Sequence, residues 1–299
     1  MKKQNNFIFL FIQLKMVEIF ECLKTVVVVL CINIYCFLYG FYTCIVGKGN
    51  VYYLCIHLTD ILGAKEHLIK GAPEIAKGKV MFLCNHRSWA DFFVDSVAVG
   101  GASYLSRLMV IVGVPGPAFV AWMNNFVWFF HRKRGISREW LTHFFEEHWK
   151  TREQDGCVVY PEGHRFVGKG TLKLKTGVLE VAYNMNVPVQ ILLTANKEVL
   201  LNEKELKFQF GTNLISNTSK VLMPHDYGTK EEWFDAVHKI WDEVETELEA
   251  KKDDANNYVY TGYPLPGRTI EDTHYYPVNS KARIIVFSIF IAIFMLYFL

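Results

Sequence analysis

A histidine and an aspartate five residues apart are the first side chains in this sequence that could do chemistry. His86 and Asp91 lie in the run NHRSWAD, which follows the apolar segment VMFLC at 80–84 without a break. If the residues between them turn into a helix, the Asp91 carboxylate can accept the Nδ1 proton of His86 and leave Nε2 to take a proton from a hydroxyl group. The same logic governs the His–Asp part of a hydrolase triad. Alone, the pair also fits a structural histidine and an aspartate that begins a helix.

A second polar turn follows another apolar run. Glu162, Gly163 and Arg165 lie in the run YPEGHR, directly after the segment CVVY at 157–160. A guanidinium group suits bidentate contact with a phosphate, and a glutamate can bind a hydroxyl group or hold the arginine in place. Alone, the turn is also typical of a salt-bridged surface loop.

A basic cluster forms the third candidate. The run FFHRKR at 129–134 places three fixed positive charges, Arg132 among them, after an aromatic segment that could end a strand or a helix. Such a cluster can contact a phosphate, but it is also typical of a solvated turn or of a patch at a membrane surface.

Taken together and in this order, these motifs resemble the signatures of the glycerolipid acyltransferases, typified by the 1-acylglycerol-3-phosphate acyltransferases. The resemblance covers roughly residues 65–193. The family's NHxxxxD motif, its PEGTR-like turn and its VPV-like strand are matched in turn by Asn85, His86 and Asp91, by Pro161, Glu162, Gly163 and Arg165, and by Val187, Pro188 and Val189.

The sequence departs from the family pattern on the side that should bind the acceptor. The second motif usually has a glycine, then an apolar run that ends in Asp-Arg. This chain has Phe126 at the glycine position and His131 in place of the aspartate, and only Arg132 is in register. His164 stands where the family generally has threonine.

The resemblance implies a reaction and its participants. His86 would remove the proton from the free hydroxyl of a lysophospholipid, 1-acylglycerol-3-phosphate first among them. That hydroxyl would attack the thioester of acyl-CoA, a co-substrate, while Asp91 stabilises the imidazolium; the product would be phosphatidic acid. No cofactor is implied. The residues implied for acceptor binding are Glu162, Gly163, Arg165 and Arg132, with Asn85, Pro161 and Pro188 as supporting positions.

The departures leave a second hypothesis open. The chain could be a catalytically reduced or inactive subunit that keeps the acyltransferase fold and has a structural role in a membrane protein complex. The altered second motif, His164 and the apolar C-terminal tail all permit this hypothesis.

Several other classes of function find no support. A net charge of +2 gives no electrostatic case for binding nucleic acid. His143 and His148 share a predicted helix but lack a third ligand nearby, so no metal site is predicted. The seven cysteines show no CxxC spacing and indicate reduced, packed thiols.

The elements that must position these residues alternate between short apolar runs and longer amphipathic ones. This alternation predicts one α/β acyltransferase domain with a central, mostly parallel or mixed sheet flanked by helices. The predicted strands are 80–84, 157–160 and 187–193, and the predicted helices are Arg138–Glu153, Lys173–Asn184 and Lys230 to about Lys251.

Apolar residues concentrate at both ends of the chain. Hydrophobic residues make up 51% of the sequence, and the segment 25–47 has no formal charge over the length that a bilayer core requires of a helix. The predicted organisation is a membrane helix or helical hairpin over 1–47, the catalytic domain over 48–252, an irregular linker over 253–283, and a tail over 284–299 that binds a membrane or a partner. We therefore expect an intracellular membrane protein, in the endoplasmic reticulum by default or in a mitochondrial membrane.

Overall fold

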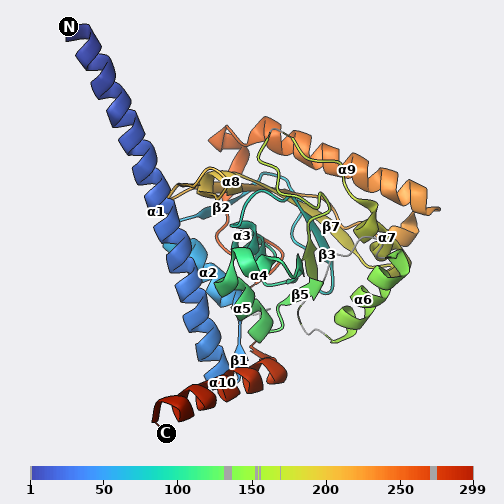
Figure 1. Cartoon of the computed structure of the whole chain (residues 1–299). Helices are drawn as coiled ribbons and strands as arrows, with labels where there is room; N and C mark the ends of the chain where they lie inside the picture. The colour runs from blue at the N-terminus through green and yellow to red at the C-terminus, as the bar shows by residue number, and fades with distance from the viewer. Residues whose placement is uncertain are drawn as a thin grey trace.

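The computed structural model of the chain describes residues 2–130, 137–151, 154, 156–168, 170–269 and 275–298 (Figure 1). For residues 2–15, 17, 297 and 298 it describes only the helical backbone. Figure 1 shows a twisted sheet flanked by helices, with the long helix α1 running past one side of it.

The sheet has eight strands in the order β11-β2-β10-β7-β3-β6-β4-β5. Strands β7, β3, β6, β4 and β5 form a parallel block, β10 is antiparallel to β7 and parallel to β2, and β11 is antiparallel to β2. The predicted α/β class with a mixed central sheet is therefore confirmed. The strand bounds are β2 Lys65–Ile69, β3 Met81–Cys84, β4 Ser103–Arg107, β5 Val127–Phe130, β6 Cys157–Val159, β7 Val189–Ala195, β10 Asn213–Thr218 and β11 Tyr258–Tyr260.

The central strand β3 shows why the sheet needs helices on both faces. Phe82 and Cys84 belong to one hydrophobic cluster, whereas Met81 and Leu83 belong to another, because successive side chains of a strand point to opposite faces. All four side chains are fully buried. A parallel strand covered on both sides is typically apolar throughout, as this one is.

The helices cover these two faces. Helix α9 occupies the predicted range and begins with a capping box between Thr229 and Glu232. The described helices are α1 Lys2–Val46, α2 Val51–Ile61, α3 Asp91–Ala98, α4 Val110–Gly113, α5 Pro115–Met123, α6 Arg138–Thr151, α7 Thr176–Met185, α8 Lys197–Leu200, α9 Lys230–Lys251 and α10 Ser280–Phe298. The fold also contains two 3-10 turns, Pro224–Asp226 and Ala255–Asn257. Two small strand pairs complete it: β1 Lys48–Gly49 with β12 Tyr276–Pro277, and β8 Leu201–Asn202 with β9 Lys207–Phe208.

The N-terminal segment is one continuous helix, so the structure does not adopt the alternative of a hairpin. The part from Glu18 to Val46 is long and apolar enough to cross a membrane, by length and composition. The helix packs closely on α5, where the Asn33 Oδ1 atom accepts a hydrogen bond of 2.9 Å from the Gly116 N–H. A side chain at position 116 would overlap the Asn33 backbone, so glycine permits this approach.

The prediction of an irregular linker over 253–283 is wrong in two places. Strand β11 extends the main sheet, and Arg268 is buried with hydrogen bonds of 2.9 and 3.0 Å to the carbonyl groups of Ala76 and Gly78. Helix α10 starts before the predicted tail, and its Ala282 and Val286 pack in a small cluster at the end of α1. Most of this segment therefore belongs to the folded protein.

Gly156, just before β6, offers a test of the packing that positions the site. It has a φ of +87°, and a Cβ atom there would lie 2.3 Å from the Val80 carbonyl oxygen. We expect Gly156→Ala to lower the free energy of unfolding by about 2–4 kcal/mol, because it combines a left-handed backbone with a clash. Denaturant unfolding of the detergent-solubilised protein measures this change.

Gly71→Ala is the matched control. Gly71 has a φ of +85°, but nothing lies within 4 Å of the position of its Cβ. Gly71→Ala should therefore lower the free energy of unfolding by only about 1 kcal/mol. Equal losses in the two variants would show that the contact with Val80 does not matter.

Candidate active site

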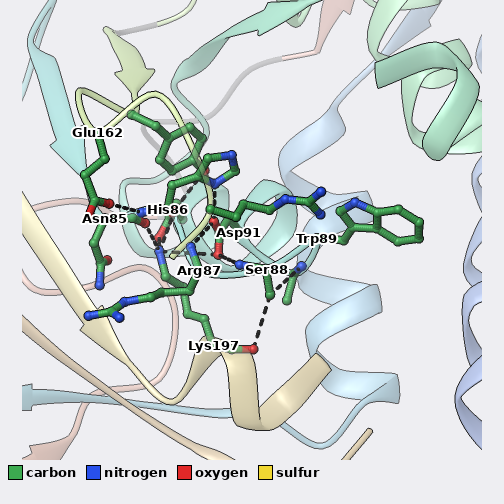
Figure 2. A network of polar contacts seen from close by, with 12 residues as sticks. Asn85, His86, Arg87, Ser88, Trp89, Asp91, Glu162 and Lys197 are labelled. Carbon is green, nitrogen blue, oxygen red and sulfur yellow. Dashed lines mark hydrogen bonds and ion pairs between the residues drawn. The ribbon is translucent and has the colours of Figure 1, made fainter. Parts of the chain in front are cut away.

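The first candidate pair lies where β3 ends and α3 begins. Residues 85–90 turn back between them, and the Nδ1 atom of His86 lies 2.6 Å from the Oδ2 atom of Asp91 (Figure 2). The His86 side chain is 27% exposed, whereas that of Asp91 is 1% exposed. With Nδ1 held by the carboxylate, Nε2 is the ring nitrogen left for another molecule.

The Asp91 carboxylate is held from several directions. It accepts hydrogen bonds from the main-chain N–H groups of Arg87 at 2.8 Å and Ser88 at 3.1 Å, and the Lys197 ammonium lies 3.5 Å from its Oδ1 atom. Burial alone raises the pKa of Asp91, but Lys197 and the hydrogen bonds from His86 and Arg87 outweigh it and hold the pKa below its usual value. Asp91 therefore remains a carboxylate that keeps the proton of His86 on Nδ1.

Lys197 is a member of this site that sequence reasoning missed. It begins α8, just after β7, and its side chain has no exposed surface. Its ammonium group lies 3.0 Å from each carboxylate oxygen of Asp95 and 2.7 Å from the carbonyl oxygen of Asn85. Burial lowers the pKa of Lys197, but Asp91 and Asp95 raise it further, so the side chain stays charged. The only signal in the sequence was its place at the exit of a third apolar strand.

Tyr160 was also missed, because the sequence presents it only as the last residue of a predicted strand. Its ring stacks on the His86 imidazole, with the centroids 4.3 Å apart and the planes inclined by 16°. Its hydroxyl group donates a hydrogen bond of 2.8 Å to Asp95. Burial raises the pKa of Tyr160, so it remains a neutral phenol that fixes the plane of the imidazole.

Glu162 joins the two candidate turns. Its buried carboxylate accepts a hydrogen bond of 2.7 Å from the His86 main-chain N–H and another of 2.8 Å from that of Leu172. Figure 2 shows Glu162 on the main-chain side of His86. Both oxygens are thus engaged by the backbone. Glu162 is bonded to the main chain at His86 and Leu172, and its predicted contact with an acceptor stays a prediction.

Arg165 lines the same cavity as His86, as expected of a phosphate ligand, but its guanidinium group makes an ion pair that the sequence did not predict. Its guanidinium group pairs with Glu203 and lies 5.6 Å from the centre of the Trp89 ring. Arg132, the other predicted phosphate ligand, lies outside the described residues.

The remaining motif residues act through the main chain or through hydrogen bonds between strands. The Asn85 amide exchanges two hydrogen bonds of 3.0 Å with the backbone of Thr194 and so ties the end of β3 to β7. The carbonyl groups of Pro161, Gly163 and Pro188 accept hydrogen bonds from the Lys175 N–H at 2.8 Å, the Arg107 guanidinium at 3.0 Å and the Met81 N–H at 2.8 Å.

A cavity of about 1340 Å³ opens at His86. Part of its wall is basic and comes from β4, α6, the turn after β6, the residue before α7 and the turn between β8 and β9. Another part is apolar and comes from α1, α4 and α5. The basic lining residues are Arg107, Arg138, Arg165, Lys175 and Lys204. A site with these two walls suits an amphiphilic, anionic ligand. Among the described residues, no cluster of three or more His, Cys, Asp or Glu side chains could hold a metal ion.

Comparison with known proteins agrees with this geometry. Residues 64–192 match the family model described as Acyltransferase, and this range contains both the His86 turn and the Glu162 turn. Residues 64–192 therefore resemble an acyltransferase domain, in agreement with the resemblance predicted from the motifs.

A solved structure shares the fold. The crystal structure of the 1-acyl-sn-glycerophosphate (LPA) acyltransferase PlsC from Thermotoga maritima superimposes with a TM-score of 0.55 at 16% sequence identity. The match covers 76% of this chain and 97% of that chain. A comparison with curated protein sequences gives no match.

The bridging role of Glu162 can be tested by stability. In Glu162→Gln the amide group must turn a donor toward one of two main-chain N–H groups, so we expect a loss of about 1–3 kcal/mol in the free energy of unfolding. Hydrogen exchange should also rise in the peptides that contain His86 and Leu172. Glu205→Gln is the matched control, because Glu205 pairs with Lys207 on the surface; it should change stability by less than about 0.5 kcal/mol. Equal effects of the two substitutions would contradict the bridge.

Proposed function

We propose that this protein transfers a fatty acyl group from acyl-CoA to the free hydroxyl group of a lysophospholipid, with 1-acylglycerol-3-phosphate as the first candidate acceptor. The observation that carries the proposal is the contact of 2.6 Å between His86 and Asp91 in the wall of a large, partly basic cavity. A histidine held in this way can accept a proton from an alcohol. The acyltransferase domain supplies the class of reaction.

The reaction follows from the two ring nitrogens of His86. Nε2 takes the proton of the acceptor hydroxyl as its oxygen forms a bond with the thioester carbonyl carbon, and Asp91 stabilises the imidazolium that results. The tetrahedral intermediate then collapses, the bond between carbon and sulfur breaks, and the departing thiolate of CoA takes the proton from Nε2. The products are an ester and free CoA, and the chain forms no covalent intermediate.

The acceptor's phosphate finds complementary charge in the basic wall of the cavity. Arg165 is the leading candidate ligand, because it lines the same cavity as His86 and because an arginine can bind a phosphate with two hydrogen bonds. The apolar wall, with Val29 and Ile32 of α1 and Val110 of α4, fits a fatty acyl chain. Much of the rate enhancement would then come from holding two substrates in register.

The protein would work at a membrane, where its acceptor resides. Helix α1 carries an apolar segment long enough to span a bilayer, and both this segment and α10 expose many large apolar side chains. Since Val29 and Ile32 line the cavity, the same helix would connect the membrane to the site.

Replacement of the proposed base tests the function directly. The purified protein, given labelled acyl-CoA and a panel of lysophospholipids, should form diacyl product. His86→Ala should lower kcat/KM by about 10²–10⁴-fold, because it removes general base catalysis. Thin-layer separation of the labelled lipids measures the product.

His143→Ala is the matched control, since the His143 side chain is 68% exposed on α6 and pairs only with glutamates of the same helix among the contacts described. It should keep its activity. If the unmodified protein and His86→Ala both give background counts with every acceptor, the enzyme proposal fails, and the hypothesis of an inactive subunit in a membrane complex takes its place.

Arg165 can be tested through the Michaelis constants. Arg165→Ala should raise the KM for lysophosphatidic acid by about 10–100-fold, the size expected when a charged hydrogen bond to a phosphate is lost. The KM for acyl-CoA should stay within about twofold. Glu203→Gln removes the ion pair but keeps the guanidinium group, so it should not raise the KM for the acceptor. An equal rise in both Michaelis constants for Arg165→Ala would exclude a specific role in acceptor binding.

A further inference from the structure

Lys197 has a fully buried ammonium group between two carboxylates, directly behind the proposed base. We propose that Lys197 is a positioning residue for acyl transfer, which fixes the charge and orientation of Asp91 and thereby controls when His86 can accept a proton. The proposal rests on the proposed function, since it assigns a role within that same site. It makes a prediction about protonation that a merely structural lysine would not.

The geometry gives Lys197 three sets of acceptors. Its Nζ atom lies 2.7 Å from the Asn85 carbonyl oxygen, 3.0 Å from both oxygens of Asp95 and 3.5 Å from the Oδ1 atom of Asp91. An ammonium group has three protons to donate, so these contacts use its full capacity. Because Asn85 immediately precedes His86, the ammonium group ties the histidine's own main chain to the helix that carries both aspartates.

Lys197, Asp91 and Asp95 form a buried cluster whose charges do not sum to zero while His86 is neutral. Asp91 and Asp95 carry two negative charges when both are ionised, and Lys197 carries one positive charge. When His86 takes a proton from the acceptor, the sum becomes zero. The buried cluster is therefore arranged to accept the one positive charge that the reaction places on His86, in surroundings where such interactions are strong.

The other titratable groups packed against the buried side of the cluster are neutral near pH 7 or are held by main-chain groups. On the cavity side His86 faces the basic residues Arg107, Arg138, Arg165, Lys175 and Lys204, which are the same in the variants Lys197→Met and Asp95→Asn. Burial raises the pKa of Glu66 to about 8 despite its hydrogen bond from Ser216, so this side chain is largely protonated. Burial also raises the pKa values of Cys84, Tyr104 and Tyr160. Glu162 accepts two main-chain N–H groups, and the Arg87 guanidinium group is bonded to the carbonyl groups of Phe166, Gly168 and Gly170.

Asp95 differs from Asp91 in a way that makes the pair useful for a test. Burial raises the pKa of Asp95 to about 6, with Lys197 acting against the rise and Asp91 adding to it. At neutral pH and above, Asp95 is thus mainly ionised and contributes a negative charge that favours the imidazolium. Lys197 and Asp95 therefore act on His86 with opposite signs.

The test compares Lys197→Met with Asp95→Asn in the full-length, detergent-solubilised protein, through the dependence of kcat/KM on pH. Without Lys197 the two carboxyl groups lose the cation that lowers their pKa values, so the cluster binds a proton at higher pH and the acid limb of the profile should move to higher pH by about one unit or more. Without the Asp95 charge the limb should move to lower pH. A lysine that only stabilises the fold would lower the amount of active protein and leave the limb in place.

A second readout does not depend on activity. Diethylpyrocarbonate modifies neutral imidazole, so the pH dependence of His86 modification, followed by mass spectrometry, reports the protonation of His86. Its midpoint should rise in Lys197→Met and fall in Asp95→Asn, whereas that of the exposed His143 should stay constant in both. Asp95→Asn keeps the test open if Lys197→Met does not fold.

The two proposals can fail separately. If the unmodified protein transfers no acyl group but the His86 midpoints move in opposite directions, the proposed function fails and the electrostatic role of Lys197 stands. If the midpoints and the acid limbs stay unchanged, or move in the same direction in both variants, the role proposed for Lys197 is overturned.

Discussion

A buried carboxylate without compensation is strongly unfavourable, and much of the site follows from how the protein satisfies Asp91. The carboxylate lies in the first turn of α3, where the helix dipole favours a negative charge, and it receives two main-chain N–H groups, the imidazole of His86 and the ammonium group of Lys197. Each of these contacts fixes a different segment of chain. The imidazole is thereby held with one nitrogen inward and the other available to a ligand.

The sheet topology makes this arrangement possible. Strands β3, β6 and β7 are parallel neighbours, so their carboxyl ends open at one edge of the sheet. His86, Tyr160 and Lys197 follow these three strands, although they are far apart in the sequence. Glu162 and Asn85 then link the loops to one another and to β7 through hydrogen bonds to the main chain. The site is therefore built on the rigid end of the sheet.

The sequence allowed the fold class and part of the site to be predicted, because those features depend on local patterns. Helix α9 has a long apolar stripe against a charged face, and its bounds agree with the prediction. The turn that brings His86 to Asp91 is also local, since five residues separate them. Strand β11 escaped prediction because Tyr258–Tyr260 is short and lies among turn-forming residues, and only its pairing with β2 makes it a strand.

Lys197 and Glu162 illustrate what could not be predicted. A lysine is ordinarily a surface residue, and its burial here depends on two carboxylates about a hundred positions earlier in the chain. The role of Glu162 depends on the His86 backbone, which only the sheet brings near. The central claim is that an ionised, buried Asp91 makes His86 a base. The most direct test is the rate of lysophospholipid-dependent CoA release from acyl-CoA by Asp91→Asn, beside the unmodified protein and with folding checked by circular dichroism. A folded variant slowed by about 10²–10⁴-fold would agree with the account, whereas a folded variant within about threefold of the unmodified rate would contradict it.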